Sequence, residues 1–181
     1  RFLSVPNMLN ILRQVSIVGI LAIGMTFVIL TKGIDLSVGS ILGLSVVLYA
    51  GFLEQYSMLV AIPLGLLAAM AAGLINGIGV AWAGIPPFIM TLGMLSFARG
   101  LAFIYTGGTP VPILNENFYN LGNGYIAGIP IPSLILLAVL LVSGVILALT
   151  TFGRSIYAIG SNEEAARLSG VPVNLYKVAV Y

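Results

Sequence analysis

The 181-residue sequence contains no cysteine and no histidine. Within this stretch, these absences exclude disulfides, thiol catalysis, zinc ligation by cysteine or histidine, and acid–base chemistry by imidazole. Charged residues make up only 7% of the chain, whereas soluble domains contain about 25%. The net charge of +2 is small and its positive residues are scattered, so the sequence does not indicate nucleic-acid binding.

Apolar residues are what the sequence has in excess. They make up 60% of the chain, and the mean hydropathy is +1.14. Soluble domains are about 45–50% apolar, and this chain has too little polar surface to cover a globule. Lipid and neighbouring helices must therefore surround most side chains. The composition predicts an all-α, polytopic transmembrane helix bundle.

Long apolar stretches predict about five membrane spans plus the start of a sixth. Residues 1–14 are amphipathic and suit the membrane interface, residues 106–132 form the longest aqueous loop, and residues 174–181 begin the sixth span. The chain starts without methionine and stops inside an apolar run, so we expect one transmembrane domain that is part of a longer protein. The predicted spans are 15–31, 36–53, 58–82, 88–105 and 133–152.

The positive residues predict the orientation of these spans. Lysine and arginine gather after the fifth span, which places residues 153–172 in the cytoplasm. Alternation then puts residues 51–57 and 106–132 outside, and neither loop contains lysine or arginine. The same alternation puts Arg1 and Arg13 outside, against the rule. A further span before Arg1 would return the true N-terminus to the cytoplasm.

A polar segment, residues 31–40, interrupts the first apolar run. It is either an ordinary tight turn, with Gly33 taking an unusual backbone angle, or a broken element that lines a solute path. Non-helical backbone inside a membrane is tolerated only against protein or water, and Asp35 could there contact a polar solute. Ser37 and Ser40 are suited to bond the free amides at the start of the next helix.

Two further polar residues lie within the spans. Asn76 is suited to hydrogen-bond another helix or to contact a solute, and Gly73 and Gly77 near it belong to a small-residue face for close helix packing. Arg99 either extends to the headgroups or faces a wet cavity. The candidate solute-path residues are Gly33, Asp35, Ser37, Asn76 and Arg99.

The most polar run of the chain, residues 153–172, contains helix-start and helix-stop signals. Ser161 can cap a helix, and Glu164 follows at the spacing of a capping box. Gly170 can end the helix in a left-handed conformation, and Pro172 prevents its continuation. These signals predict one short helix over residues 161–170, about 12 Å long, at the cytoplasmic face.

This short helix is predicted to dock on another protein. Glu163 and Glu164 in its first turn and Arg167 in its last suit the helix dipole and could pair with a partner at the rim. The small Ala165 and Ala166 would allow close approach. The candidate coupling residues are Ser161, Asn162, Glu163, Glu164, Ala165, Ala166, Arg167 and Gly170.

The sequence shows no equipment for catalysis. It has no phosphate-binding glycine loop, because the GIDLSVG stretch lacks the required spacing and lysine. It has no carboxylate pair placed for acid–base work. We therefore expect no catalytic residues, no metal site, no cofactor and no ATP hydrolysis by this chain.

Three segments resemble the ribose/galactose/xylose-type permease subunit of bacterial ABC importers. They are GMTFVILTKGIDLSVGS at 24–40, ARGLAFIYTGGTPV at 98–111 and GRSIYAIGSNEEAARLSGVPV at 153–173. The third contains the Glu-Ala-Ala-x-x-x-Gly pattern of importer permeases, and the likeness extends over essentially the whole chain. Lys32 departs from the pattern, since a small residue is usual there.

The resemblance implies a monosaccharide importer in the bacterial inner membrane, for a ribose-like pentose or a hexose. It implies that residues 161–170 are a coupling helix seated in a groove of an ATPase subunit that uses ATP and Mg²⁺. It also implies a second permease copy in a homo- or heterodimer, an extracytoplasmic sugar-binding protein, one helix before Arg1 and about four or five after Tyr181.

Two alternatives remain open at this point. A related permease for nucleosides, branched-chain amino acids or a signalling sugar would have the same architecture. A stand-alone secondary carrier or channel would need ionisable residues inside its spans for ion coupling, and only Arg99 and Asp35 qualify.

Overall fold

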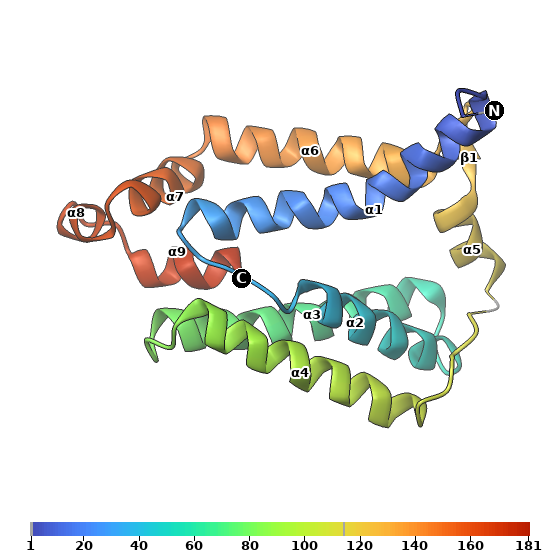
Figure 1. The fold of residues 1–181 in the computed structure, drawn as a ribbon, viewed down its shortest axis with the longest axis horizontal. Helices are drawn as coiled ribbons and strands as arrows, with labels where there is room; N and C mark the ends of the chain where they lie inside the picture. Colours follow the sequence, from blue (N-terminus) through green and yellow to red (C-terminus); the bar gives the residue numbers. More distant parts are fainter. Residues whose placement is uncertain (1, 114) are drawn as a thin grey trace. The chain divides into compact units, whose positions relative to one another are not determined.

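The computed structural model describes residues 2–113 and 115–181 and is helical apart from one small hairpin in that part of the chain (Figure 1). The helices long and apolar enough to cross a membrane are α1 (Val5–Leu30), α3 (Met58–Ala81), α4 (Pro87–Thr106) and α6 (Ile131–Leu149). Helix α2 (Val38–Leu53) is apolar but only 16 residues long. The long apolar helices confirm the predicted all-α, polytopic class.

The remaining elements are short. Helix α5 (Glu116–Asn123) precedes strands β1 (Tyr125–Ile126) and β2 (Ile129–Pro130), which pair antiparallel. Both residues of the connecting turn have positive φ, as a type I′ hairpin turn requires. Three helices end the chain in sequence order: α7 (Thr151–Ser161), α8 (Glu163–Leu168) and α9 (Val173–Val180).

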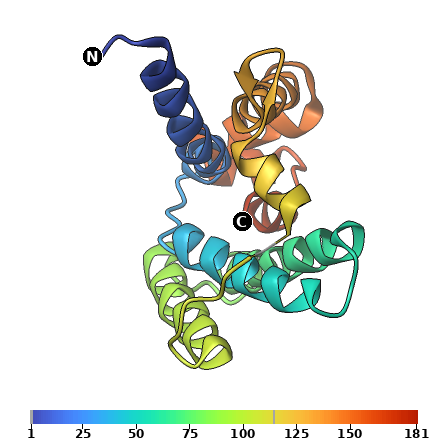
Figure 2. The ribbon, with the colours of Figure 1, turned by 90° about the vertical axis from the view of Figure 1, so that its right-hand side faces the viewer.

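The chain divides into two compact units, which are described separately. The first contains most of α1, helix α5, the hairpin and α6. Within it α1 and α6 lie side by side (Figures 1 and 2). The buried hydroxyls of Ser16 and Ser133 are 3.0 Å apart, and a β-carbon on Gly19 would come within 2.9 Å of Leu136. The two helices therefore meet through small residues and one polar pair.

Arg13 of α1 finds its partners in the loop that was predicted to be extracytoplasmic. Its guanidinium donates a hydrogen bond to the carbonyl of Asn123 (3.0 Å) and lies 5.0 Å from the centre of the Tyr125 ring. These contacts give a physical reason for a positive residue next to this loop, where the charge rule alone would not place it.

The second unit contains α2, α3, α4, α8, α9 and most of α7. Helix α3 packs against α2, α4 and α9. A β-carbon on Gly77 would lie 2.8 Å from the Cα of Val178, and one on Gly73 would overlap the Tyr181 carbonyl. The predicted small-residue face of α3 is thus confirmed as a helix-packing surface. Helix α9 packs on it and runs antiparallel to α3.

Several helix ends differ from the sequence prediction. Residues 5–14 continue directly into the first span, because nothing breaks the helix between Val5 and Leu30. Helix α6 ends at Leu149 and not at 152, since Thr150 has extended backbone angles (φ −106°, ψ 163°) and α7 begins at Thr151. The Thr150 hydroxyl accepts from the Gly153 amide (3.2 Å) and donates to the Ile146 carbonyl (2.6 Å). Residues 106–132 contain α5 and the hairpin, where the sequence indicated only a loop.

Candidate coupling element and buried polar cluster

The N-cap of helix α8 lies one residue later than predicted. Asn162 is its N-cap, with extended backbone angles (φ −149°, ψ 106°) and an Oδ1 that accepts from the Ala165 amide at 3.0 Å. The predicted capping box from Ser161 to Glu164 is wrong, because Ser161 is still the last residue of α7. A capping residue must leave helical geometry, and Asn162 is the first that does so.

The end of α8 confirms the predicted stop signal. Gly170 has φ +85°, the left-handed conformation that glycine adopts without strain. Its amide bonds the Arg167 carbonyl (3.0 Å), and the Val171 amide bonds the Ala166 carbonyl (3.1 Å). The helix has six residues and is therefore about 9 Å long, shorter than predicted. The polar run 153–172 also contains most of α7, so it is not a single helix.

One side of α8 is occupied within the chain. Ala166 is buried in a small apolar cluster with Ile159 of α7 and Val173 of α9. Ala166 was predicted to face a partner, and the structure contradicts this. Its small side chain instead lets α8 pack closely on its neighbours.

Glu163 belongs to the same inward side. Its carboxylate accepts hydrogen bonds from Lys177 of α9 (2.6 Å) and from Arg167 one turn further on (3.2 Å). The hydrogen bond from Lys177 is the main cause that lowers the pKa of Glu163, the charges of Lys177 and Arg167 also lower it, and partial burial opposes them. Glu163 therefore holds α8 to α9.

The other side of α8 faces outward. Glu164 and Ala165 are exposed, and Leu168 is 84% exposed. Leu168 was not among the predicted coupling residues. The signal for it was available, since it is the one leucine between Gly153 and Pro172. A large apolar side chain on a polar, water-facing element is suited to a protein contact.

A second polar group lies buried where α1 gives way to α2. The Asp35 carboxylate accepts from the Ser37 amide (2.7 Å) and the Ser37 hydroxyl (2.6 Å). Since the Ser37 hydroxyl donates to Asp35, Asn76 must donate to its oxygen, and the Asn76 Nδ2 lies 2.9 Å away. All three residues are at most 6% exposed. The expected interhelical hydrogen bond of Asn76 is confirmed.

Because Asn76 donates to Ser37, the side-chain oxygen of Asn76 is left without a hydrogen-bond donor in the described part of the chain. With the Asn76 amide nitrogen committed to Ser37, its Oδ1 is buried and has no partner among the described residues. A buried carbonyl oxygen without a donor is costly. The site is therefore suited to a donor from outside this set, such as a water or a hydroxyl group.

The backbone of the break differs from both sequence interpretations in detail. Lys32, not Gly33, has the unusual angle (φ +60°). Gly33 is needed for space, because a β-carbon there would lie 2.6 Å from the Tyr181 hydroxyl and 2.9 Å from Val28. Ser37 makes no side-chain cap, since its hydroxyl is already used by Asp35.

The break is packed inside the second unit. Helix α2 begins only at Val38 and is about 24 Å long, short of the roughly 30 Å of a bilayer core. The carbonyl of Ile34 lies 3.4 Å from the hydroxyls of Thr91 and Tyr181. Thr91 is buried on α4 and is a member of the cluster that sequence reasoning missed.

Arg99 does not join this cluster. It is exposed on α4, two turns further along the helix than Thr91. The structure thus brings together Gly33, Asp35, Ser37 and Asn76 of the predicted solute-path residues and leaves Arg99 apart.

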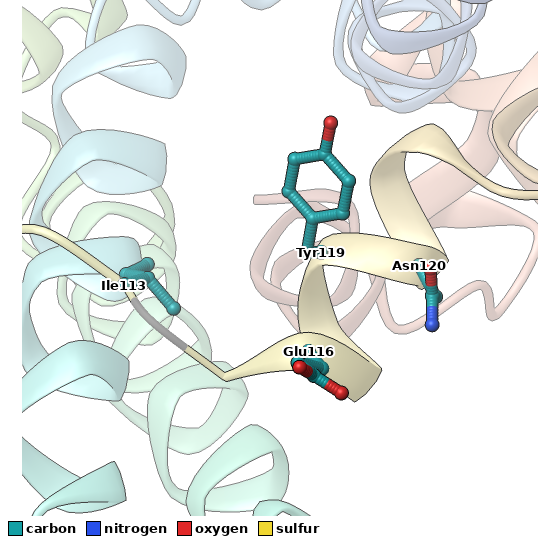
Figure 3. Close-up of a pocket in the computed structure, with 4 residues that line it drawn as sticks. All are labelled: Ile113, Glu116, Tyr119 and Asn120. Atoms are coloured by element: carbon teal, nitrogen blue, oxygen red, sulfur yellow. The ribbon is translucent and has the colours of Figure 1, made fainter.

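The predicted outer loop contains an open hollow of about 420 Å³ beside α5 (Figure 3). Ile113, Glu116, Tyr119 and Asn120 line it. In Figure 3 the Tyr119 hydroxyl points away from the Glu116 carboxylate. Because these polar groups do not converge, the hollow does not form a ligand site by itself.

The four long apolar helices in the described part of the chain define a polytopic membrane protein. The chain belongs to the family described as branched-chain amino acid transport system / permease component, whose model matches residues 7–181. It is a multi-pass protein of the bacterial inner membrane, and its relatives are transport subunits.

Three relatives illustrate the range of the family. The ribose import permease of Bacillus subtilis (strain 168) is 46% identical over 99% of this chain and 57% of its own length. The L-arabinose ABC transporter permease of Azospirillum brasilense is 38% identical over 99% and 53%. The autoinducer 2 import permease of Salmonella paratyphi B is 36% identical over 100% and 53%. The chain thus spans somewhat more than half the length of these relatives. No solved structure matches it.

Proposed function

We propose that this chain is part of the membrane-spanning subunit of an ATP-driven, binding-protein-dependent importer for a monosaccharide, a ribose-like pentose or a hexose. The observation that carries the proposal is α8. It is capped at both ends, fixed to α7 and α9 through Ala166 and Glu163, and presents Glu164, Ala165 and Leu168 outward. A rigid, outward-facing helix can pass on force from a partner.

The partners follow from this role. ATP and Mg²⁺ belong to an ATPase subunit that seats α8, since the sequence has no phosphate-binding loop of its own. A second permease subunit, in a homo- or heterodimer, completes the path. An extracytoplasmic sugar-binding protein delivers the solute. The names of the relatives favour ribose first, with L-arabinose and autoinducer 2 as the alternatives.

The buried cluster is the part of this chain best suited to meet the solute. Asp35, Ser37 and Asn76 are hydrogen-bonded to each other, and the Asn76 Oδ1 has capacity for a donor such as a sugar hydroxyl. Gly33 shapes the backbone beside them. Arg99 is exposed on α4, apart from this cluster, and is not assigned to the path.

Reconstitution of the full-length protein tests the function. Uptake of labelled ribose is measured in liposomes that contain the permease, its ATPase subunit and the binding protein, with ATP inside. We expect uptake that requires all three and stops without ATP. Sugar uptake by the permease alone, driven by an ion gradient, would instead establish a secondary carrier.

A further inference from the structure

The end of α7 touches the end of α1, far away in sequence. The Lys32 ammonium donates a hydrogen bond to the Ser161 carbonyl at 3.2 Å. One residue earlier, a β-carbon on Gly160 would overlap the carbonyl of Leu30. The two segments are therefore in direct backbone contact at one point.

Each side of this contact leads directly to one of the two polar features. On the α7 side, Ser161 is followed at once by Asn162, the residue that caps α8. On the α1 side, Lys32 is followed by Gly33 and then by Ile34 and Asp35 of the buried cluster. No flexible linker separates the contact from either feature.

The contact depends on unusual local geometry on both sides. At position 160 only glycine lets the helix backbone approach the Leu30 carbonyl this closely, because any side chain would occupy the same space. Lys32 holds a left-handed conformation, which is uncommon outside glycine. This turn directs its side chain to Ser161 while the backbone enters the break.

We infer that the contact of Lys32 and Leu30 with Gly160 and Ser161 makes α8 and the break at residues 31–37 move as one rigid piece. This inference rests on the proposed function and identifies where force applied to α8 enters the membrane part of the chain. Lys32 and Gly160 act as positioning residues, because they touch neither the solute nor the ATPase.

The test measures ATP hydrolysis and sugar uptake in the same reconstituted full-length importer. Gly160→Ala is expected to lower uptake per ATP hydrolysed by at least about fivefold, the low end of a typical coupling effect, while ATPase binding and hydrolysis persist. Gly144→Ala in α6 is the matched control, since nothing lies within 4 Å of that position. Unchanged uptake per ATP in Gly160→Ala would overturn the inference.

Lys32 variants separate the amine from the backbone angle. Lys32→Gly keeps the left-handed conformation but removes the donor, whereas Lys32→Arg keeps a donor. We expect the glycine variant to lose uptake per ATP and the arginine variant to retain most of it. Equal values for all three proteins would show that the amine plays no part.

A cross-link tests rigidity by replacing the Lys32–Ser161 hydrogen bond with a covalent connection. Lys32→Cys and Ser161→Cys are joined by a short bifunctional thiol reagent, in a background without other cysteines. The described chain contributes none. Before cross-linking, the double variant lacks the Lys32 donor and is expected to lose uptake per ATP as Lys32→Gly does. If the two segments move as one rigid piece, the cross-link should form and restore that uptake. Failure to cross-link in membranes, or no recovery of uptake on cross-linking, would contradict the inference even if the unmodified importer works. Absence of ATP-driven uptake in the unmodified protein would instead refute the proposed function.

Discussion

Two polar segments interrupt the apolar sequence, and they satisfy their polar groups in opposite ways. In the break at residues 31–37, Asp35 and Ser37 are buried and bond each other and Asn76. In the segment around α8, Glu163 is tied to α9 through Lys177, while Glu164 and Leu168 face out.

The difference indicates which segment needs something from outside. Buried polar groups are stable only when they are paired, and the break supplies nearly all its own partners. The α8 segment instead exposes a leucine, which gains free energy when another surface covers it. The break is thus expected to govern stability and solute passage, and α8 to govern association.

Asp35→Ala should give the largest effect on stability. It leaves the buried amide and hydroxyl of Ser37 without their acceptor, at a cost of about 1–3 kcal/mol for each stranded donor. Thermal unfolding of the full-length protein in detergent measures the loss. Asp35→Asn keeps an acceptor oxygen and should lose clearly less. Equal stability of the alanine variant and the unsubstituted protein would mean that the break is not held by this network.

Gly170→Asp should uncouple transport without preventing insertion. At φ +85° a side chain costs about 1–2 kcal/mol, and it would displace the end of α8. We expect ATP-driven uptake to fall at least about fivefold. Gly84→Asp is the control, since Gly84 also has positive φ (+66°) and open space around it but belongs to the turn between α3 and α4. A similar loss in both variants would assign the effect to backbone strain alone.

Leu168→Ser should weaken binding of the ATPase subunit and leave stability unchanged. Burying a leucine contributes about 1.5–3 kcal/mol, so affinity should fall about tenfold or more. Binding to the full-length permease in lipid nanodiscs measures it. Leu59→Ser is the control, because Leu59 is matched in exposure (87% against 84%) and lies at the start of α3, next to the loop 51–57 that was predicted to be outside. This variant should not change ATPase binding. Undiminished binding by Leu168→Ser would remove this leucine from the interface.

Much of this architecture could be predicted from local sequence. The long apolar runs gave the helices, the spacing of Gly73 and Gly77 gave the face that receives α9, and Gly170 gave the end of α8. Each of these depends on a residue type and its neighbours along the chain, which is the information that a single sequence contains.

The errors arose where packing between elements decides the outcome. Ser161 could not cap α8 because α7 extends through it, and Ala166 is covered because Ile159 and Val173 of the adjoining helices pack on it. The partnership of Ser37 with Asn76 joins residues 39 positions apart, so nothing local to either residue could reveal it.

Glu163 offers the smallest and most specific test of the comparison, because it is the one inward-turned acid of α8. Its folded-state pKa is lowered below the ordinary 4.5, chiefly by the hydrogen bond from Lys177. Its stabilisation of the α8–α9 contact is therefore present above pH 4.5 and is lost as the pH falls through the lower, folded-state value. The ion pair is partly exposed, so its contribution to the stability of the α8–α9 contact is about 0.5–1 kcal/mol.

Hydrogen exchange of α8 in the full-length protein, corrected for intrinsic rates, should accelerate a few-fold at acidic pH. Glu163→Gln should exchange at the faster rate at neutral pH and show no such dependence. If the variant kept the same acid response, the titrating group would have to be another one, and α8 would not be held to α9 by this carboxylate.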